Sequence, residues 1–385
     1  MQKSSTHTFA GQLEEQYASY RSDAFASRRF SPEQFHHVLD EIAGKSSGLL
    51  SIKKAGESFE GRPIRLVTAG TGPLSVLLWS QMHGDESTAT MAITDILMYL
   101  SKTNKEDYTK KILSALTLHF LPMLNPDAAA RFQRRTAQGI DMNRDALSLR
   151  TPEARILKQL QQELKPHFGF NLHDQELSTV STTKELTAIA VLAPAFNPEK
   201  KDNEIRTRAK HLAAFFAGVA NRFAPKKVAR YDDSFEPRAF GDNMQKWGTS
   251  TVLVESGHAM DDREKNSIRK LNVIGILASL YAIANGEYEQ SDTNIYESLP
   301  FNGKRAYDLI IRDIAIDHGN GTSTMADIGV SYQVDTHTES TPVLVDLGDL
   351  HTFIGLKEID GKGKPIPHAK LVFGKAFAWE SFFTH

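Results

Sequence analysis

Two residues of this chain, His83 and Glu86, have the types and the spacing of metal ligands. An imidazole and a carboxylate three positions apart can close on one metal ion. The apolar run at 74–79 predicts a buried strand before them, and the apolar spacing over 87–101 predicts a helix after them. The pair therefore lies at a strand-to-helix turn, where ligands of α/β proteins usually bind. Two surface side chains would show the same spacing, so the interpretation depends on the rest of the chain.

A third candidate ligand is His173, which follows the predicted strand 167–172. Two histidines and one glutamate around zinc leave an open coordination position for water, as in a catalytic rather than a structural site. The alternative for His173 is a strand-end histidine that is hydrogen-bonded to the backbone. The chain has no cysteine, so nitrogen and oxygen atoms must hold any transition metal.

Two further segments carry charges that such a site could use. The apolar run 251–255 predicts a buried strand that ends in Glu255, and a carboxylate there costs free energy unless it is used or paired. The arginines of 131–135 precede the segment 140–145. Fixed guanidinium groups near a metal can neutralise a developing oxyanion or clamp a carboxylate. The alternative for these arginines is a solvated basic face.

The composition is that of an ordinary globular protein. Hydrophobic residues make up 40% and charged residues 24% of the chain, and the net charge of -2 gives no argument for nucleic acid or an anionic membrane as a partner. No stretch approaches 18 consecutive apolar residues. The first residues lack the apolar core of a signal peptide, which makes a cytoplasmic location the default expectation. A periplasmic or secreted location is expected instead if a signal peptide has been removed.

With 385 residues, the chain is long enough for a large domain and a smaller one. Strand and helix patterns alternate over 48–286, which predicts an α/β fold with a mixed, mostly parallel twisted sheet and helices on both faces. Residues 1–47 resemble a helical lead-in, and the polar stretch 287–294 resembles a linker. Gly-rich turns and short alternating runs over 295–385 predict a small β-rich, β-sandwich-like domain. The predicted strands are 49–54, 64–68, 74–79, 116–121, 167–172, 188–192, 251–255, 306–316, 343–347 and 370–373, and the predicted helices are 87–101, 152–164, 204–223 and 264–284.

With these residues in view, the chain resembles the zinc carboxypeptidase family typified by carboxypeptidase A, in a bacterial branch with a C-terminal accessory domain. The resemblance covers roughly residues 45–285 and rests on several motifs that occur in the family's order. The motifs lie at 60–63, 83–86, 125–127, 134–136, 141–144, 171–173 and 254–255.

The resemblance implies a site for one Zn²⁺ ion, with His83, Glu86 and His173 as its ligands. It implies that Glu255 is the general base, which deprotonates the attacking water and later protonates the leaving amine. Zinc would polarise the scissile carbonyl and make the water acidic enough to attack near neutral pH.

The resemblance also implies roles for residues around the metal. Arg134 matches the arginine that steadies the oxyanion of the tetrahedral intermediate. Asn143 and Arg144 match the pair that holds the terminal carboxylate of the substrate. Asp141 matches the acid that orients the first zinc histidine, a role that fixes the tautomer and strengthens the ligand.

Some positions depart from the family pattern or leave it open. The family's usual tyrosine is not evident, because Tyr231 lies 24 residues before Glu255. The arginine alignment can also slip by one residue, which would put Arg135 in the place of the oxyanion arginine. Arg238 and Phe240 lie in the window that lines the side-chain pocket in the family. Arg238 would favour an acidic substrate side chain, or it is salt-bridged to a neighbour.

The predicted function is a zinc metallocarboxypeptidase that hydrolyses the C-terminal amide bond of a peptide, or of a peptide-like substrate, with a free carboxylate. One alternative is a zinc amidohydrolase that deacylates N-acyl amino acids or acts on peptidoglycan-type peptides. An alternative of another class is a non-catalytic carboxylate-binding module. Glu255 argues against that alternative, because binding alone needs no general base. We expect no nucleic-acid partner, and the sequence does not specify an oligomeric state.

Overall fold

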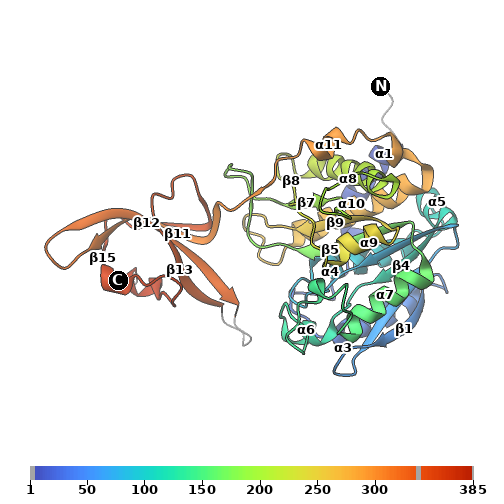
Figure 1. Cartoon of the computed structure of the whole chain (residues 1–385), viewed down its shortest axis with the longest axis horizontal. Helices are drawn as coiled ribbons and strands as arrows, with labels where there is room; N and C mark the ends of the chain where they lie inside the picture. The colour runs from blue at the N-terminus through green and yellow to red at the C-terminus, as the bar shows by residue number, and fades with distance from the viewer. Residues whose placement is uncertain (1–4, 335–339, 384–385) are drawn as a thin grey trace. The chain divides into compact units, whose positions relative to one another are not determined.

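The computed structural model describes residues 5–334 and 340–383 (Figure 1). It divides into two compact units, the first of Met1–Gln175 and Ala188–Phe301 and the second of Glu176–Thr187 and Asn302–His385. The first unit thus continues beyond the end predicted for the catalytic domain, through the stretch predicted as a linker. It does so because Tyr288 and Tyr296, which follow that end, are buried in its core.

An eight-stranded sheet forms the centre of the first unit. Its strands are β1 (Ser51–Glu57), β2 (Pro63–Ala69), β3 (Leu74–Trp79), β4 (Leu116–Leu121), β5 (Phe168–Asp174), β7 (Ile189–Leu192), β8 (Val228–Arg230) and β9 (Ser250–Ser256). Their order across the sheet is β1-β2-β4-β3-β5-β9-β7-β8. The central strands β4, β3, β5 and β9 run parallel, and the strands on either side of them, β2 and β7, run antiparallel to them. The prediction of a mixed, mostly parallel sheet is confirmed.

Helices cover both faces of this sheet, as β3 shows. Val76 and Leu78 of this strand belong to one core cluster, and Leu77 and Trp79 belong to another. Successive side chains of a strand point to opposite faces, so each cluster lies on its own face of the sheet. The helices are α1 (Ser5–Glu15), α2 (Tyr17–Tyr20), α3 (Pro32–Lys45), α4 (Thr88–Lys102), α5 (Asp107–Ala115), α6 (Pro126–Arg131), α7 (Pro152–Leu164), α8 (Glu204–Phe223), α9 (Phe240–Lys246), α10 (Asn266–Asn285) and α11 (Asn294–Glu297).

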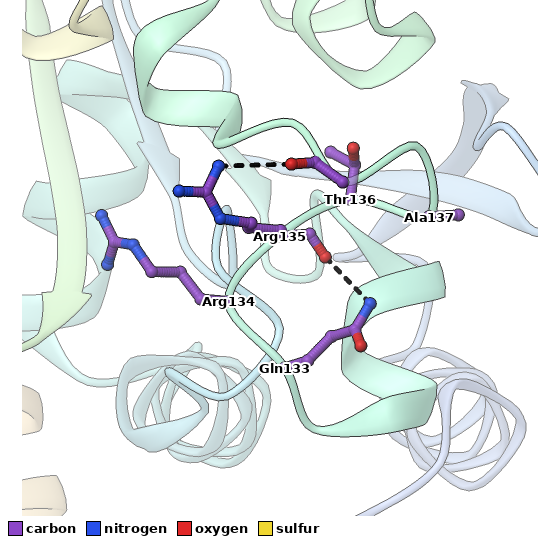
Figure 2. A pocket seen from close by; sticks show the side chains of 6 residues that line it. Gln133, Arg134, Arg135, Thr136 and Ala137 are labelled. Carbon is purple, nitrogen blue, oxygen red and sulfur yellow. Dashed lines mark hydrogen bonds between the residues drawn. The ribbon is translucent and has the colours of Figure 1, made fainter. Parts of the chain in front are cut away.

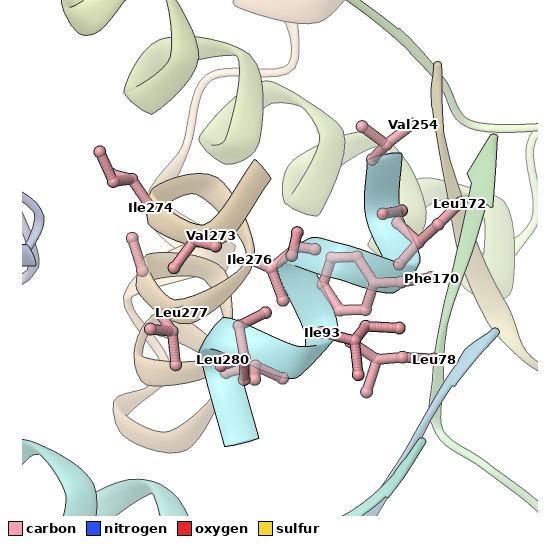
Figure 3. Close-up of a cluster of buried hydrophobic side chains, with 14 of the residues drawn as sticks. Leu78, Ile93, Phe170, Leu172, Val254, Val273, Ile274, Ile276, Leu277 and Leu280 are labelled. Carbon is pink, nitrogen blue, oxygen red and sulfur yellow. The ribbon is translucent and has the colours of Figure 1, made fainter. Parts of the chain in front are cut away.

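The helix α10 is long and apolar enough to cross a membrane by length and composition alone. In the structure, 83% of its most apolar window is buried inside the first unit. Figure 3 shows Val273, Ile276 and Leu280 of this helix in the same cluster as Ile93 of α4 and Phe170 of β5. A helix that is apolar on all sides is typical of a protein core, so its packing accounts for its composition.

The segment 5–45, here called the N-terminal arm, is bound to the core by a buried polar network. The network centres on Asp95 of α4 and Arg269 of α10, both fully buried, whose Oδ2 and Nε atoms lie 2.7 Å apart. Tyr17 of the arm donates its hydroxyl to Asp95 Oδ2 at 2.7 Å, and the backbone N–H of Ser22 donates to Oδ1 at 2.8 Å. The arm, predicted as a lead-in, is therefore part of the first unit.

Replacing Tyr17 with phenylalanine should lower the free energy of unfolding by about 2 kcal/mol, because hydrogen bonds to charged groups contribute about 1.5–3 kcal/mol. Tyr20→Phe is the matched control, since the Tyr20 hydroxyl donates at 2.7 Å to the uncharged carbonyl of Leu13. Its loss should be about 1 kcal/mol. Urea unfolding of the two full-length variants measures the difference, and equal losses would contradict the importance of the charged acceptor.

The second unit is rich in β-structure, as predicted. Its five-stranded sheet has the order β13-β12-β11-β14, with β15 paired to β11, and β6 pairs with β10 in a separate two-stranded sheet. These strands are β6 (Thr179–Val180), β10 (Asn302–Gly303), β11 (Ala306–Asp317), β12 (Ser323–Val334), β13 (Ser340–Gly348), β14 (Ile354–Asp360) and β15 (Pro365–Pro367). The pairing of β6 with β10 explains why Glu176–Thr187, which we predicted within the catalytic domain, belongs to this unit.

The core of the second unit differs from the predicted β-sandwich. Ile311 and Leu344 of the five-stranded sheet pack in one cluster with Phe377 and Trp379 of the C-terminal segment. A non-strand segment therefore contributes to this core, where a sandwich would place a second sheet. The predicted strand at 370–373 is wrong, because this segment continues from a short 3-10 helix into a turn.

Candidate metal centre

Three buried side chains converge at the carboxyl ends of β3 and β5. Glu86 Oε1 lies 2.7 Å from His83 Nδ1, and Glu86 Oε2 lies 2.7 Å from His173 Nδ1. One potential ligand atom from each of the three residues lies within 4.8 Å of the other two. The structure therefore brings the three predicted ligands together.

The turn that carries His83 requires glycine at the next position. A Cβ atom on Gly84 would lie 2.1 Å from the backbone carbon of Ala128 in α6. Asn125, at the start of α6, donates from Nδ2 to the carbonyl of Met82 at 3.1 Å. The motif at 125–127 thus holds the ligand-bearing turn in place from the start of α6.

The motif at 60–63 supports the same helix. Asp127 of α6 is fully buried and accepts hydrogen bonds from the Ser58 hydroxyl at 2.7 Å and from the backbone N–H of Glu60 at 2.8 Å. Arg62 donates to Asp127 Oδ1 at 2.8 Å. The motifs at 60–63 and 125–127, which contributed to the family resemblance, therefore stabilise the backbone that supports the site and do not form part of the site itself.

Asp141 lies where it can orient His83. Its Oδ1 atom lies 3.0 Å from His83 Nε2, on the side of the ring opposite Glu86. Burial acts to raise the pKa of Asp141, but the hydrogen bond and charge of His83, together with Arg134, hold that pKa well below its usual range. An ionised Asp141 accepts a hydrogen bond from Nε2 and so leaves Nδ1 for a metal ion.

Glu255 stands beside His173 because the two residues are register partners on the parallel strands β9 and β5. It is 7% exposed, and its Oε2 atom is buried with no hydrogen-bond partner among the described residues. Burial, and then the charge of Glu86, raises the pKa of Glu255 well above its usual value. A buried carboxyl group that the fold does not pair is costly, and perturbed groups of this kind cluster at functional sites.

Arg134 reaches the ligand residues, and Arg135 does not. Arg134 Nη1 lies 3.1 Å from Glu86 Oε1, and Nη2 donates to Asp141 Oδ2 at 3.0 Å. Arg135 instead donates to the carbonyl of Gly139 at 3.2 Å. Both arginines line a hollow of about 390 Å³. Figure 2 shows their guanidinium groups apart from each other. The geometry favours Arg134 in the alignment that the sequence left open.

Two of the predicted substrate-binding residues, Arg144 and Arg238, lie beside the carboxylate of Glu236. Arg144 Nε lies 3.4 Å from Glu236 Oε2, and Arg238 grips the same carboxylate through two hydrogen bonds of 2.9 and 2.8 Å. Asn143 Oδ1 accepts the backbone N–H of Phe240 at 2.9 Å. The side chain of Phe240 is fully buried, so it offers no surface to a substrate, in contrast to our prediction. Glu236 was not predicted as a site residue. Its only indication in the sequence is its position two residues before Arg238.

The donor set suits a transition metal such as zinc. Two imidazoles and one carboxylate supply three ligands, and a three-ligand site leaves a coordination position open. The outer nitrogen of His83 is hydrogen-bonded to Asp141, as is usual for ligating histidines. With Glu255 beside it, the site makes this an α/β protein with a candidate metal centre at the carboxyl edge of its sheet.

Comparison with known proteins shows a similarity to one family over part of the chain. Residues 35–184 match the model of the zinc carboxypeptidase family. Carboxypeptidase 2 of Trichophyton rubrum is 29% identical over an alignment of 174 positions that covers 40% of this chain and 32% of that protein. The chain therefore contains a segment that is similar to the zinc carboxypeptidase family, and it spans about a third of the length of this curated relative.

Solved structures share the fold. A metallo-carboxypeptidase from Burkholderia cenocepacia has a TM-score of 0.55 and 18% identity, covering 67% of this chain and 70% of that one. Carboxypeptidase A from Helicoverpa armigera has a TM-score of 0.53 and 16% identity, covering 73% and 81%. At such identities the likeness concerns the fold, and it confirms the predicted carboxypeptidase-like α/β architecture.

Proposed function

We propose that this protein is a zinc carboxypeptidase that hydrolyses the last amide bond of a peptide with a free terminal carboxylate. The observation that carries this proposal is the buried carboxyl group of Glu255 beside the metal-ligand candidate His173, with its Oε2 atom unpartnered in the part of the chain that the structure describes. Zinc bound by His83, Glu86 and His173 would polarise the scissile carbonyl and lower the pKa of the attacking water.

The chain's own residues then account for the movement of protons and charge. Glu255 takes a proton from the attacking water as the water oxygen bonds to the carbonyl carbon. It gives that proton to the amine nitrogen as the carbon–nitrogen bond breaks. Arg134 lies beside the metal centre, within hydrogen-bond distance of Glu86. Its guanidinium can therefore donate a hydrogen bond to the carbonyl oxygen of the scissile amide while negative charge develops on that oxygen.

The cluster around Glu236 supports action at the end of a chain. Arg144 is partly exposed and pairs with Glu236 at 3.4 Å, which is a weak contact that a substrate carboxylate could replace. Arg238 is held by two shorter bonds to the same carboxylate, so it is less free to bind a substrate. Arg144 is therefore the proposed anchor of the terminal carboxylate, with Asn143 beside it.

The test is hydrolysis of matched peptides that differ only in a free or amidated C-terminus. We expect release of single C-terminal residues from the free acids, to be stopped by chelation, and no cleavage of the amides, because an amide cannot form the ion pair with Arg144. Mass spectrometry of the products measures both. Equal rates on the two forms would contradict the proposal and indicate an endopeptidase or another amidase.

N-acyl amino acids and peptidoglycan-type peptides belong in the same assay, because they also carry an amide next to a free carboxylate. Cleavage of those pools alone would favour the zinc amidohydrolase. Stoichiometric zinc binding without any product would favour the carboxylate-binding module, which does not need Glu255 as a general base.

A further inference from the structure

We propose that Arg28 of the N-terminal arm is a positioning residue of the metal centre, which acts through Asp174 to fix the carboxylate of Glu86. The inference rests on the metal-binding part of the proposed function. It goes beyond that function because it makes a segment outside the family-matched residues 35–184 a determinant of metal affinity.

Asp174, the residue after the ligand His173, is the centre of this arrangement. Its backbone N–H donates to Glu86 Oε2 at 3.2 Å. Its side chain is only 5% exposed, and Oδ2 accepts three hydrogen bonds. The donors are Thr88 Oγ1 at 2.6 Å, Arg28 Nη1 at 3.1 Å and Lys265 Nζ at 3.3 Å. The side chain thus anchors a backbone group that holds a metal ligand.

Arg28 has a second contact with the ligand-bearing segments. Its backbone carbonyl accepts a hydrogen bond of 2.7 Å from the hydroxyl of Ser87, the residue after Glu86. Its guanidinium meanwhile holds Asp174 on the other segment. One residue of the arm therefore connects the turn that follows β3 with the end of β5.

The arm is fixed on both sides of Arg28. Phe25 and Phe30 are buried, with their ring centroids 4.3 Å apart. The backbone N–H of Arg28 donates to Glu264 Oε2 at 2.7 Å. Further back, Ser22 binds the buried Asp95. A guanidinium on so constrained a backbone is suited to positioning, because a supporting group orients a ligand only if it is itself held in place.

Removing such an outer partner of a metal ligand typically weakens metal binding by about 10- to 100-fold. Asp174 keeps two other donors when Arg28 is lost, so Arg28→Ala should weaken zinc binding about tenfold, at the lower end of that range. Competition with a chromophoric chelator, using the full-length chain, measures the zinc dissociation constant. The same affinity in Arg28→Ala and the parent protein would overturn the inference.

Arg21→Ala is the matched control. Arg21 lies in the same arm and donates at 3.0 Å to Asn266 Oδ1. The variant therefore loses an arginine contact between the arm and the core without changing a contact to either ligand-bearing segment. Its zinc affinity should equal that of the parent protein. A tenfold loss in Arg21→Ala as well would show a general effect of loosening the arm, and would overturn the specific role of Arg28.

A double-mutant cycle with Asp174→Asn tests the route of the effect. If Arg28 acts through Asp174, then Arg28→Ala should change zinc affinity much less in the Asp174→Asn background than in the parent protein. Fully additive effects would overturn this route. Thermal unfolding of the zinc-free variants checks folding, and Arg28→Lys, which keeps the charge, replaces Arg28→Ala in the cycle if the alanine variant does not fold.

Different experimental results would contradict this inference and the proposed function. A parent protein that binds no zinc would overturn both. A parent protein that binds zinc as tightly as Arg28→Ala does would overturn only the role of Arg28. A parent protein that binds zinc more tightly than Arg28→Ala, but cleaves no peptide, would support the role of Arg28 and overturn the proposed activity.

Discussion

Glu255→Gln should bind zinc stoichiometrically and cleave free-acid peptides about 10²- to 10⁴-fold more slowly than the parent protein, because general acid–base catalysis contributes factors of this size. That loss corresponds to about 3 kcal/mol or more of transition-state stabilisation. Glutamine has nearly the shape of glutamate but cannot accept the proton of the attacking water. Comparison of kcat/KM, together with zinc content by elemental analysis, measures the effect.

The matched control for this variant is Glu153→Gln. Glu153 is also a buried glutamate of the first unit, but its Oε1 atom accepts the backbone N–H of Phe59 at 3.1 Å, in the segment before β2. Its replacement should leave turnover unchanged. Near-normal turnover in Glu255→Gln would mean that another group accepts the proton, whereas slow turnover in both variants would point to a general effect of changing a buried charge.

The central elements of the fold were predictable because their patterns are long and regular. The strands β3 and β4 and the helices α7 and α8 have the predicted bounds. By contrast, β8 (Val228–Arg230) has three residues, too few to show a period, and it was missed. The helix α9 (Phe240–Lys246) was missed because its seven residues lie in a stretch that reads as a loop.

The metal ligands and Glu255 could be named from the sequence because each lies at the end of a patterned strand or in the turn that follows it. Contacts between distant segments were not predictable in this way. Arg28 reaches Asp174, 146 positions away, and periodicity within 1–47 predicts helices but not the surface against which they pack. The burial of Phe240 could not be predicted for the same reason. Besides Trp247, its core cluster contains residues of β-strands that are far away in the sequence.

His83→Ala should abolish stoichiometric zinc binding, and peptide hydrolysis with it. Glu86 and His173 alone leave two protein ligands, whereas catalytic zinc sites have three. The variant also leaves Asp141 without the imidazole that it orients. Elemental analysis after dialysis against zinc measures occupancy, and full occupancy in His83→Ala would show that the ligand set is wrong.

The control for this variant is another histidine of the same unit. His119 of β4 is 8% exposed, and its Nδ1 atom lies 3.1 Å from the hydroxyl of Thr68, a residue that is not part of the metal centre. His119→Ala should keep its zinc, even if it is less stable. Removal of zinc from the parent protein by a chelator should reproduce the inactivity of His83→Ala and be reversed by added zinc. Because added zinc cannot restore a missing ligand, rescue of the parent protein but not of His83→Ala would separate the loss of the metal site from a loss of the fold.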